Sequence, residues 1–467
     1  MSSSTNIKPQ QSILSSSEKR SAYSLAGIYA LRMLGLFMIL PVFSLYAQKL
    51  EHSTPMLIGI AIGAYGLTQA LFQIPYGYLS DRVGRKPMII AGMLIFALGS
   101  IIAAQATDIY GVIIGRLLQG SGAVAAVLMA FAADLTREEH RLKVMAIIGM
   151  SIGFSFGIAM VLGSLLEQWI GVNGIFLLTA VLALLAIVIV VFVVPNPEQI
   201  KHHRDTEAEP AKLLKMLKDP QLFRLDLGIF ILHMVLTATF LVIPLSLTQE
   251  NIGNLMLNEH WKVYLPTIFL SMILMVPFII IAETKRKMKA VFIGAIFVLS
   301  LTELCFYFFS YSAISIAVIL LIFFTAFNLL EASLPSLVAK ISPAENKGTA
   351  MGVYSTSQFL GAFSGGVFGG LVMDFGGMQS VYLFAVICLL SWLLIAVTMK
   401  SPRYLSNFIV KVSNAKSEDI IHLTQMLTEV NGVAEAVIDL EVGEAFLKVD
   451  LHALDRDKLL QVSNQYC

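Results

Sequence analysis

The chain has 467 residues, of which 57% are hydrophobic and 13% are charged. A soluble core of this length cannot bury so much apolar surface, so the composition excludes an ordinary soluble protein and indicates a membrane protein. The formal net charge of +1 gives no reason to expect nucleic acid as a partner.

A polar, serine-rich leader over residues 1–21 precedes the first apolar run. The run lacks a small-residue cleavage site, so we expect a retained helix and not a signal peptide. About 20 helical residues cross a hydrocarbon core of ~30 Å, and a helix satisfies its own backbone groups in lipid. Twelve such runs are predicted, at 22–47, 55–79, 87–107, 108–133, 142–168, 171–195, 221–249, 260–282, 288–310, 312–339, 346–374 and 378–399.

The basic residues of the loops predict the orientation. Alternate loops on the side of the N-terminus hold about 21 Lys and Arg residues, whereas the opposite loops hold Lys49 and Lys262. Because Lys and Arg resist translocation, both termini are predicted to be cytoplasmic.

The chain divides into two six-helix halves, at 22–195 and 221–400, joined by a polar linker over 196–220. The segments that begin at Asp134 and Lys340 align without gaps and pair Glu139 with Glu345, at equivalent places in the two halves. Parallel repeats of this kind are a transporter architecture. We therefore expect an all-α membrane protein with two repeated halves.

Residues 401–467 are soluble in character and predict a small cytoplasmic βαββα domain of ferredoxin-like type. The CxxC expected of a metal-binding module after its first strand is absent, so no metal is predicted. We expect the domain to bind a regulatory ligand or to self-associate. The chain also lacks a P-loop, so neither ATP nor another cofactor is expected to drive it.

The loop between the second and third runs reads GYLSDRVGRKP, over 77–87. Its G-x-x-x-D-x-x-G-R-K spacing resembles motif A of the major facilitator superfamily, which lies between the second and third of twelve helices. Arg116, Gln119 and Gly120 resemble motif B of the same family. The glycines of helix five resemble motif C, although Ser164 stands where that motif has proline. Over nearly the full chain, the resemblance is to bacterial drug:proton antiporters that carry a ferredoxin-like domain after helix twelve.

The resemblance implies a latch made of Gly77, Asp81, Arg85 and Asp134. Asp81 would face the N-terminus of helix eleven, where backbone N–H groups favour a carboxylate. Arg85 would pair with Asp134, and Gly77 would let helix two approach helix eleven closely. These contacts would hold the outward-open state. The alternative is a topology-setting basic loop with a solvated aspartate.

Ionisable residues inside the spans are costly in lipid and usually face a cavity. Helices one, four, seven and ten line the central cavity in the fold that the resemblance implies. We therefore select Arg32, Arg116, His233 and Glu331 as cavity groups. Glu303 on helix nine is set aside as a residue near the outer interface or a structural hydrogen-bonding group. Arg116 can take part in proton coupling or can brace helices one, two and four, and Arg32 can be structural.

Further candidates follow from helical spacing. Asn328 and Glu331 are three residues apart and share a helix face, and Asp226 lies on the stripe of His233, near the cytoplasmic mouth. Polar residues on helices two and eleven recur every four positions and either line the substrate path or hold helices together: Tyr65, Gln69, Gln73, Tyr354 and Gln358.

These observations predict a secondary active transporter of the bacterial inner membrane, and not an enzyme. Its partners would be the lipid bilayer, a small-molecule substrate and protons. The leading hypothesis is proton-coupled export of a small organic compound, with Glu331 as the coupling carboxylate and His233 as its partner. Two alternatives stay open: a proton-coupled importer of a sugar or amino acid, and a non-transporting sensor that uses the C-terminal domain.

Overall fold

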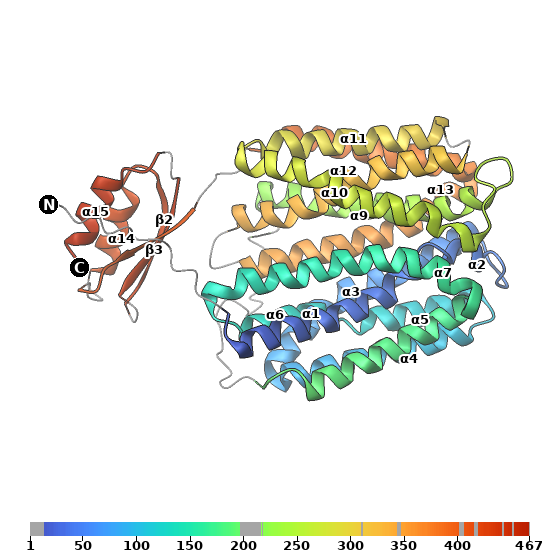
Figure 1. The fold of residues 1–467 in the computed structure, drawn as a ribbon, viewed down its shortest axis with the longest axis horizontal. Coiled ribbons are helices and arrows are strands. Elements are labelled where there is room, and N and C mark those ends of the chain that lie inside the picture. The colour runs from blue at the N-terminus through green and yellow to red at the C-terminus, as the bar shows by residue number, and fades with distance from the viewer. Residues whose placement is uncertain are drawn as a thin grey trace.

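The computed structural model describes residues 14–196, 216, 218–309, 312–342, 347–400, 406–414, 419–440, 443–450 and 453–466. Most of the predicted leader and linker lie outside these residues. A long helical bundle forms the main body, and a small α+β domain lies beyond one end of it (Figure 1). We call that end of the bundle the tail end and the opposite end the distal end.

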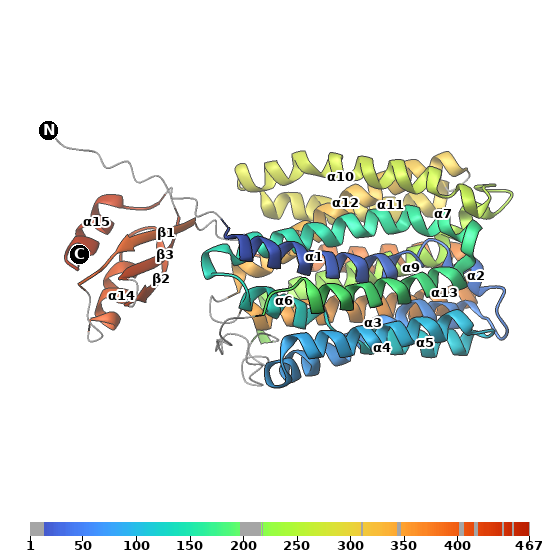
Figure 2. The same cartoon turned by 60° about the horizontal axis from the view of Figure 1, so that its bottom comes forward.

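Within the described part of the chain, nine helices are long and apolar enough to cross a membrane. The N-terminal half contains α1 (Ser16–Phe37), α2 (Phe43–Ala47), α3 (Pro55–Val83), α4 (Arg85–Gln105), α5 (Ile109–Ser121), α6 (Ala125–Asp134) and α7 (Glu138–Phe192). The C-terminal half contains α9 (Pro220–Thr248), the short 3-10 helix η2 (Leu257–Glu259), α10 (Trp261–Thr284), α11 (Met288–Phe309), α12 (Ala313–Ile341) and α13 (Lys347–Val397). The helices run roughly along one direction in both views (Figures 1 and 2).

Capping side chains define several helix starts. Ser15 and Glu18 form a capping box ahead of α1, so this helix begins before residue 22, where the apolar run starts. Thr54 accepts a hydrogen bond from the Leu57 amide at the start of α3, where Pro55 takes the first helical position. Asp108 does the same for the Gly111 amide in α5. Such caps satisfy backbone donors that a helix leaves unpaired at its start.

Two predicted helices are broken in the structure. The run at 22–47 is divided into α1 and α2 because proline at position 41 has no N–H and its ring collides with the carbonyl of Phe37, where α1 ends. The run at 108–133 is divided into α5 and α6 at Gly122. A Cβ atom on Gly122 would overlap the backbone oxygen of Gly92 in α4, so glycine permits this close approach.

Two long helices each join a pair of predicted runs. α7 covers 142–168 and most of 171–195 and is interrupted at Gly171, whose φ is 63°. α13 covers 346–374 and 378–399 and is interrupted at Gly377, whose φ is 75°. Glycine adopts positive φ without steric cost, which explains why the chain bends at these two residues.

The C-terminal domain has the predicted βαββα order, with β1 (Ser406–Lys411), α14 (Ile420–Thr428), β2 (Val433–Asp439), β3 (Glu444–Val449) and α15 (Arg456–Asn464). Its sheet is antiparallel in the order β1-β3-β2. Leu423, Leu447 and Leu459 belong to its own hydrophobic core, separate from that of the bundle. An ion pair of 3.2 Å joins Asp450 of this domain to Arg286, between α10 and α11.

The two halves meet closely at the distal end. A Cβ atom on Gly59 of α3 would overlap the backbone oxygen of Gly366 in α13, and one on Gly63 would lie 2.8 Å from the backbone oxygen of Phe363. The Met56 amide donates to Asp374 Oδ2 at 3.0 Å. Small residues allow such close helix packing in membranes.

Candidate functional site

Arg32 lies at the centre of a polar cluster in the N-terminal half. Only 1% of the residue is exposed. Its Nη2 donates to the Tyr65 hydroxyl and, at 2.5 Å, to Gln69 Oε1, while the Tyr65 hydroxyl donates to the same Gln69 oxygen at 3.2 Å. Tyr65 and Gln69, four residues apart on α3, thus hold the guanidinium of α1 from one helix face.

Arg116 braces helices of the same half. Its Nη1 donates to Gln119 Oε1 at 2.8 Å, and Gln119 in turn donates to Ser100 of α4 at 2.7 Å. Its other nitrogens reach the backbone oxygens of Ala61 and Ile62 in α3 at 3.4 Å. These contacts agree with the alternative that Arg116 braces helices two and four, which are α3 and α5. They also include the third helix, α4. A Cβ atom on Gly120 would overlap the Tyr65 oxygen, so this glycine lets α5 approach α3.

A second polar cluster lies in the C-terminal half, where α9, α12 and α13 meet. The amide nitrogen of Gln358 lies 2.9 Å from Nε2 of His233 and donates to Oε1 of Glu331 at 3.1 Å. His233 Nε2 is also 3.8 Å from Glu331 Oε2. The Glu331 side chain is 37% exposed and that of His233 is 14% exposed. The cluster therefore brings a partly buried carboxylate close to an imidazole, and Gln358 contacts both.

The two clusters come together through consecutive residues of α13. Gln358 belongs to the C-terminal cluster, and the ring of its neighbour Phe359 packs 6.2 Å from that of Tyr65 in the N-terminal cluster. One half-turn earlier, Gln73 of α3 donates to Thr356 of α13 at 2.5 Å. The polar groups of both halves thus meet where α3 and α13 pack together. We call this interface the seam.

Among the described residues, the other C-terminal candidates form no hydrogen bond with His233 or Glu331. Asn328 donates to Ser271 of α10 at 3.0 Å, so it faces a different helix from Glu331 despite their spacing. Asp226 is buried on α9, and its Oδ1 has no hydrogen-bond partner. The Tyr354 hydroxyl is also buried without a partner.

The motif A residues form a compact ionic group at the tail end. Arg85 lies 2.5 Å from Asp81 and 2.8 Å from Asp134, and it donates to the Ser80 hydroxyl at 2.6 Å. The pairing of Arg85 with Asp134, which the resemblance implied, is therefore present. Gly77 makes no close approach to α13, because a Cβ atom there would meet nothing within 4 Å. The close packing of α3 on α13 falls instead at Gly59 and Gly63.

Glu303, which the sequence analysis set aside, takes part in a contact between two helices. It is fully buried on α11, and its Oε1 accepts a hydrogen bond of 2.7 Å from Thr239 of α9. The structural alternative fits this contact. The direction of its side chain follows from the packing of α11 on α9, which the sequence alone does not show.

Sequence reasoning missed two partners of the candidate residues and one further contact between helices. Thr356 and Ser271 are ordinary hydroxyl residues within apolar helices, and no spacing distinguishes them from helix-packing groups. The contact between Glu18 and Arg137, at 3.1 Å, joins the start of α1 to the start of α7. Only the capping pattern at Ser15 and Glu18 offered a signal for the helix start, and none for the arginine.

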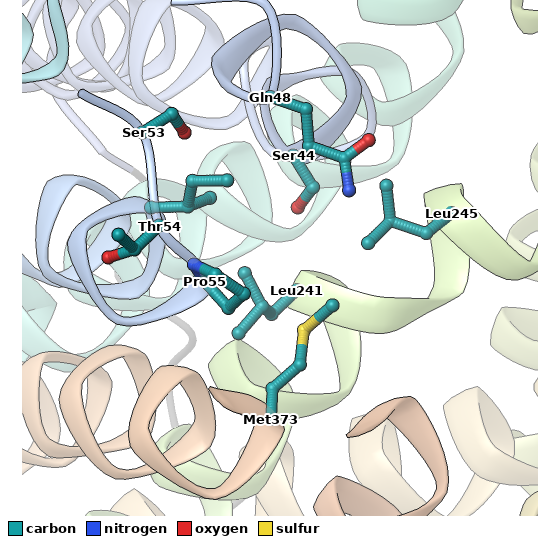
Figure 3. Close-up of a pocket in the computed structure, with 9 residues that line it drawn as sticks. Ser44, Gln48, Ser53, Thr54, Pro55, Leu241, Leu245 and Met373 are labelled. Carbon is teal, nitrogen blue, oxygen red and sulfur yellow. The ribbon is translucent and has the colours of Figure 1, made fainter. Parts of the chain in front are cut away.

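A small cavity of about 90 Å³ lies at the distal end between the two halves (Figure 3). It is lined by Ser44, Gln48, Ser53, Thr54, Pro55, Ile58, Leu241, Leu245 and Met373. Ligand sites typically occupy about 300–1,000 Å³, so this space suits a few water molecules and not an organic substrate. In the described part of the chain, no three His, Cys, Asp or Glu side chains gather in a way that could hold a metal ion.

The chain is similar to known membrane transport proteins. The family model described as Major Facilitator Superfamily matches residues 25–326 and 265–426. The inner membrane transport protein YajR of Escherichia coli is 43% identical over 96% of this chain and 98% of its own length. Multidrug resistance protein 2 of Bacillus subtilis is 25% identical over 75% of this chain and 88% of its own length.

The fold is also found in solved structures. A bacterial homologue of the human lysosomal transporter Spinster, in an inward-facing and occupied conformation, has a TM-score of 0.67 at 12% identity. The match covers 82% of this chain and 96% of that one. The chain therefore belongs to the Major Facilitator Superfamily, and it is a membrane transporter and not an enzyme.

Proposed function

We propose that this transporter couples proton movement to the antiport of a small organic compound, by alternating access. The observation that carries the proposal is the contact of His233 and Glu331 through Gln358 at the seam. A carboxylate in a low-dielectric interior can gain and lose a proton as its surroundings change. Export is favoured over import by the relative from Bacillus subtilis, whose name denotes multidrug resistance.

The described helices support the proposal of twelve spans in two six-helix halves. Nine spans qualify, with α5 and α6 counted as one, and two of the nine, α7 and α13, are each divided by a glycine into two legs. The helix pair α1 and α2 supplies the first span.

The name of the Escherichia coli relative supports an inner-membrane location, and the basic loops support cytoplasmic termini. The strand order β1-β3-β2 supports a ferredoxin-like tail that lacks a fourth edge strand.

The arrangement of the halves fits one state of such a cycle. Gly59, Gly63 and Gly66 of α3 pack closely against α13, whereas Gly77 and Gly352, towards the tail end, have open space around them. With the tail end in the cytoplasm, this is a conformation closed to the outside. The latch would bring α3 and α13 together at the tail end in the opposite state.

Proteoliposomes that contain the purified protein test the proposal. Vesicles are loaded at acidic pH, diluted into alkaline buffer and exposed to labelled organic compounds that are cationic, neutral or anionic. Antiport predicts that at least one compound accumulates inside while protons leave, and that a protonophore abolishes the accumulation. Accumulation that requires the opposite pH gradient would show co-transport with protons and would reject antiport. A panel that never responds to either gradient would reject proton coupling.

A further inference from the structure

Three nitrogen donors of the Arg32 cluster are buried and have no acceptor among the residues that the structure describes. They are Nε and Nη1 of Arg32 and Nε2 of Gln69. The remaining Arg32 nitrogen, Nη2, already donates to both Tyr65 and Gln69. A buried donor without an acceptor is costly, and a buried charge without a counter-charge costs more. The cluster is thus rich in donors and poor in acceptors.

The positive charge of this cluster is also unbalanced. Within the described residues, neither Arg32 nor Arg116 has a carboxylate in ion-pair contact, and both guanidinium groups lie within 6 Å of the Tyr65 ring centre, at 5.8 and 5.3 Å. In the C-terminal half, the buried unpartnered atoms include acceptors, Oε2 of Glu331 and Oδ1 of Asp226. At the seam, the guanidinium nitrogens without an acceptor therefore lie on the N-terminal side.

We propose that Arg32, together with Gln69, binds an oxyanion group of the transported compound, such as a carboxylate, sulfonate or phosphate. A planar guanidinium suits such a group because its nitrogens can donate to two oxygens at once. The apolar part of the compound would lie along Phe359, which packs on Tyr65 across the seam. This inference rests on the proposed transport function, which requires a substrate site at the seam, but it holds for either direction of proton coupling.

The site is covered in this conformation. The free nitrogens of Arg32 are buried, and the Tyr65 ring closes against Phe359. The anion therefore enters when α3 and α13 separate. Binding would depend on the exchange between states, which is expected of a carrier and not of a permanently open receptor.

The test uses three probes that share one ring system and differ in head-group charge: 2-naphthoate, 2-naphthylmethanol and 2-naphthylmethylammonium. Their binding to the purified full-length protein in lipid nanodiscs is measured by equilibrium dialysis. Charge-assisted hydrogen bonds predict that the naphthoate binds roughly tenfold tighter than the alcohol. Arg32→Gln should remove this preference and leave the affinity for the alcohol unchanged.

Two further variants keep the test decisive. Arg32→Lys retains the charge but loses the planar fork, so it should show an intermediate preference for naphthoate even if Arg32→Gln does not fold. Arg82→Gln removes an exposed arginine at the tail end and should behave like the wild type. Equal affinities for the three probes in the wild type, or no binding of any, would overturn the proposal, as would an unchanged preference in Arg32→Gln. Naphthoate preference without pH-driven transport would instead reject only the proton coupling.

Discussion

Gly59 of α3 and Gly366 of α13 pack backbone against backbone, so closely that a Cβ atom on either residue would overlap the backbone oxygen of the other. The contact joins the two halves at the distal end. It requires glycine for space and not for an unusual backbone conformation, since both residues lie within regular helices.

Gly59→Ala should therefore force α3 and α13 apart and destabilise this conformation. Overpacking of this kind typically costs about 1–3 kcal/mol, so the thermal unfolding midpoint in detergent should fall by several degrees. Gly77→Ala is the matched control on the same helix, because its added methyl meets nothing within 4 Å. Equal midpoints for the two variants would contradict the close contact.

Glu331→Gln should abolish pH-driven accumulation in proteoliposomes, because glutamine keeps the shape and the contact with Gln358 but cannot carry a proton. We expect the rate to fall to that of protein-free vesicles while substrate binding persists. Glu250→Gln, which changes an exposed carboxylate beyond α9, controls for the loss of one negative charge. If the Glu331 variant still concentrates a compound at the wild-type rate, coupling moves to His233 or Asp226.

The contact of Arg85 with Asp134, at 2.8 Å, should show measurable coupling in a double-mutant cycle. Both side chains are largely buried, at 12% and 16% exposure, so Arg85→Gln and Asp134→Asn should each destabilise the protein. The double variant should be less destabilised than the sum of the single variants by about 1 kcal/mol. Strict additivity of the three unfolding midpoints would mean that the pair contributes nothing to stability.

Glu18, which lies before the first predicted span, provides a pH-dependent prediction. Its contacts, with Arg137 first among them, lower the pKa of its carboxyl from the ordinary 4.5 to about 2. A lowered folded-state pKa adds stability above the unfolded-state pKa, and this stability is lost as the pH falls from about 4.5 towards 2.

Glu18→Gln should consequently lower the unfolding midpoint most at neutral pH, and the difference from the wild type should shrink in acid. Scanning fluorimetry in detergent between pH 7 and pH 3 measures this trend. Glu250→Gln serves again as the exposed control. A Glu18→Gln difference that stays constant across this range would show that the carboxylate charge is not involved.

The sequence predicts the positions of the spans well because hydropathy depends only on local composition. It does not predict where helices break: Pro41 and Gly122 interrupt runs that are apolar throughout. Proline at 75 and 244 lies inside continuous helices, so the residue type alone does not decide the outcome.

The residue type alone identifies the candidate site residues in the sequence. It does not show which of them contact one another in the structure. A charged residue in an apolar span is visible in the sequence, which is how Arg32, His233 and Glu331 were selected. Gln358 contacts both His233 and Glu331, while Asn328 contacts Ser271. These contacts depend on the rotation of α12 and α13 about their axes. Long-range packing sets that rotation, and helical spacing alone carries no information about it.

The pair formed by Arg286 and Asp450 gives the C-terminal domain a second point of attachment to the bundle, besides the chain connection after α13. Both attachments are to the C-terminal half. Any rotation of that half against the other would therefore move the tail with it. A fluorophore on α15 and another at the start of α4, at the tail end, would then follow the transport cycle by energy transfer, with neither label in the middle of the membrane.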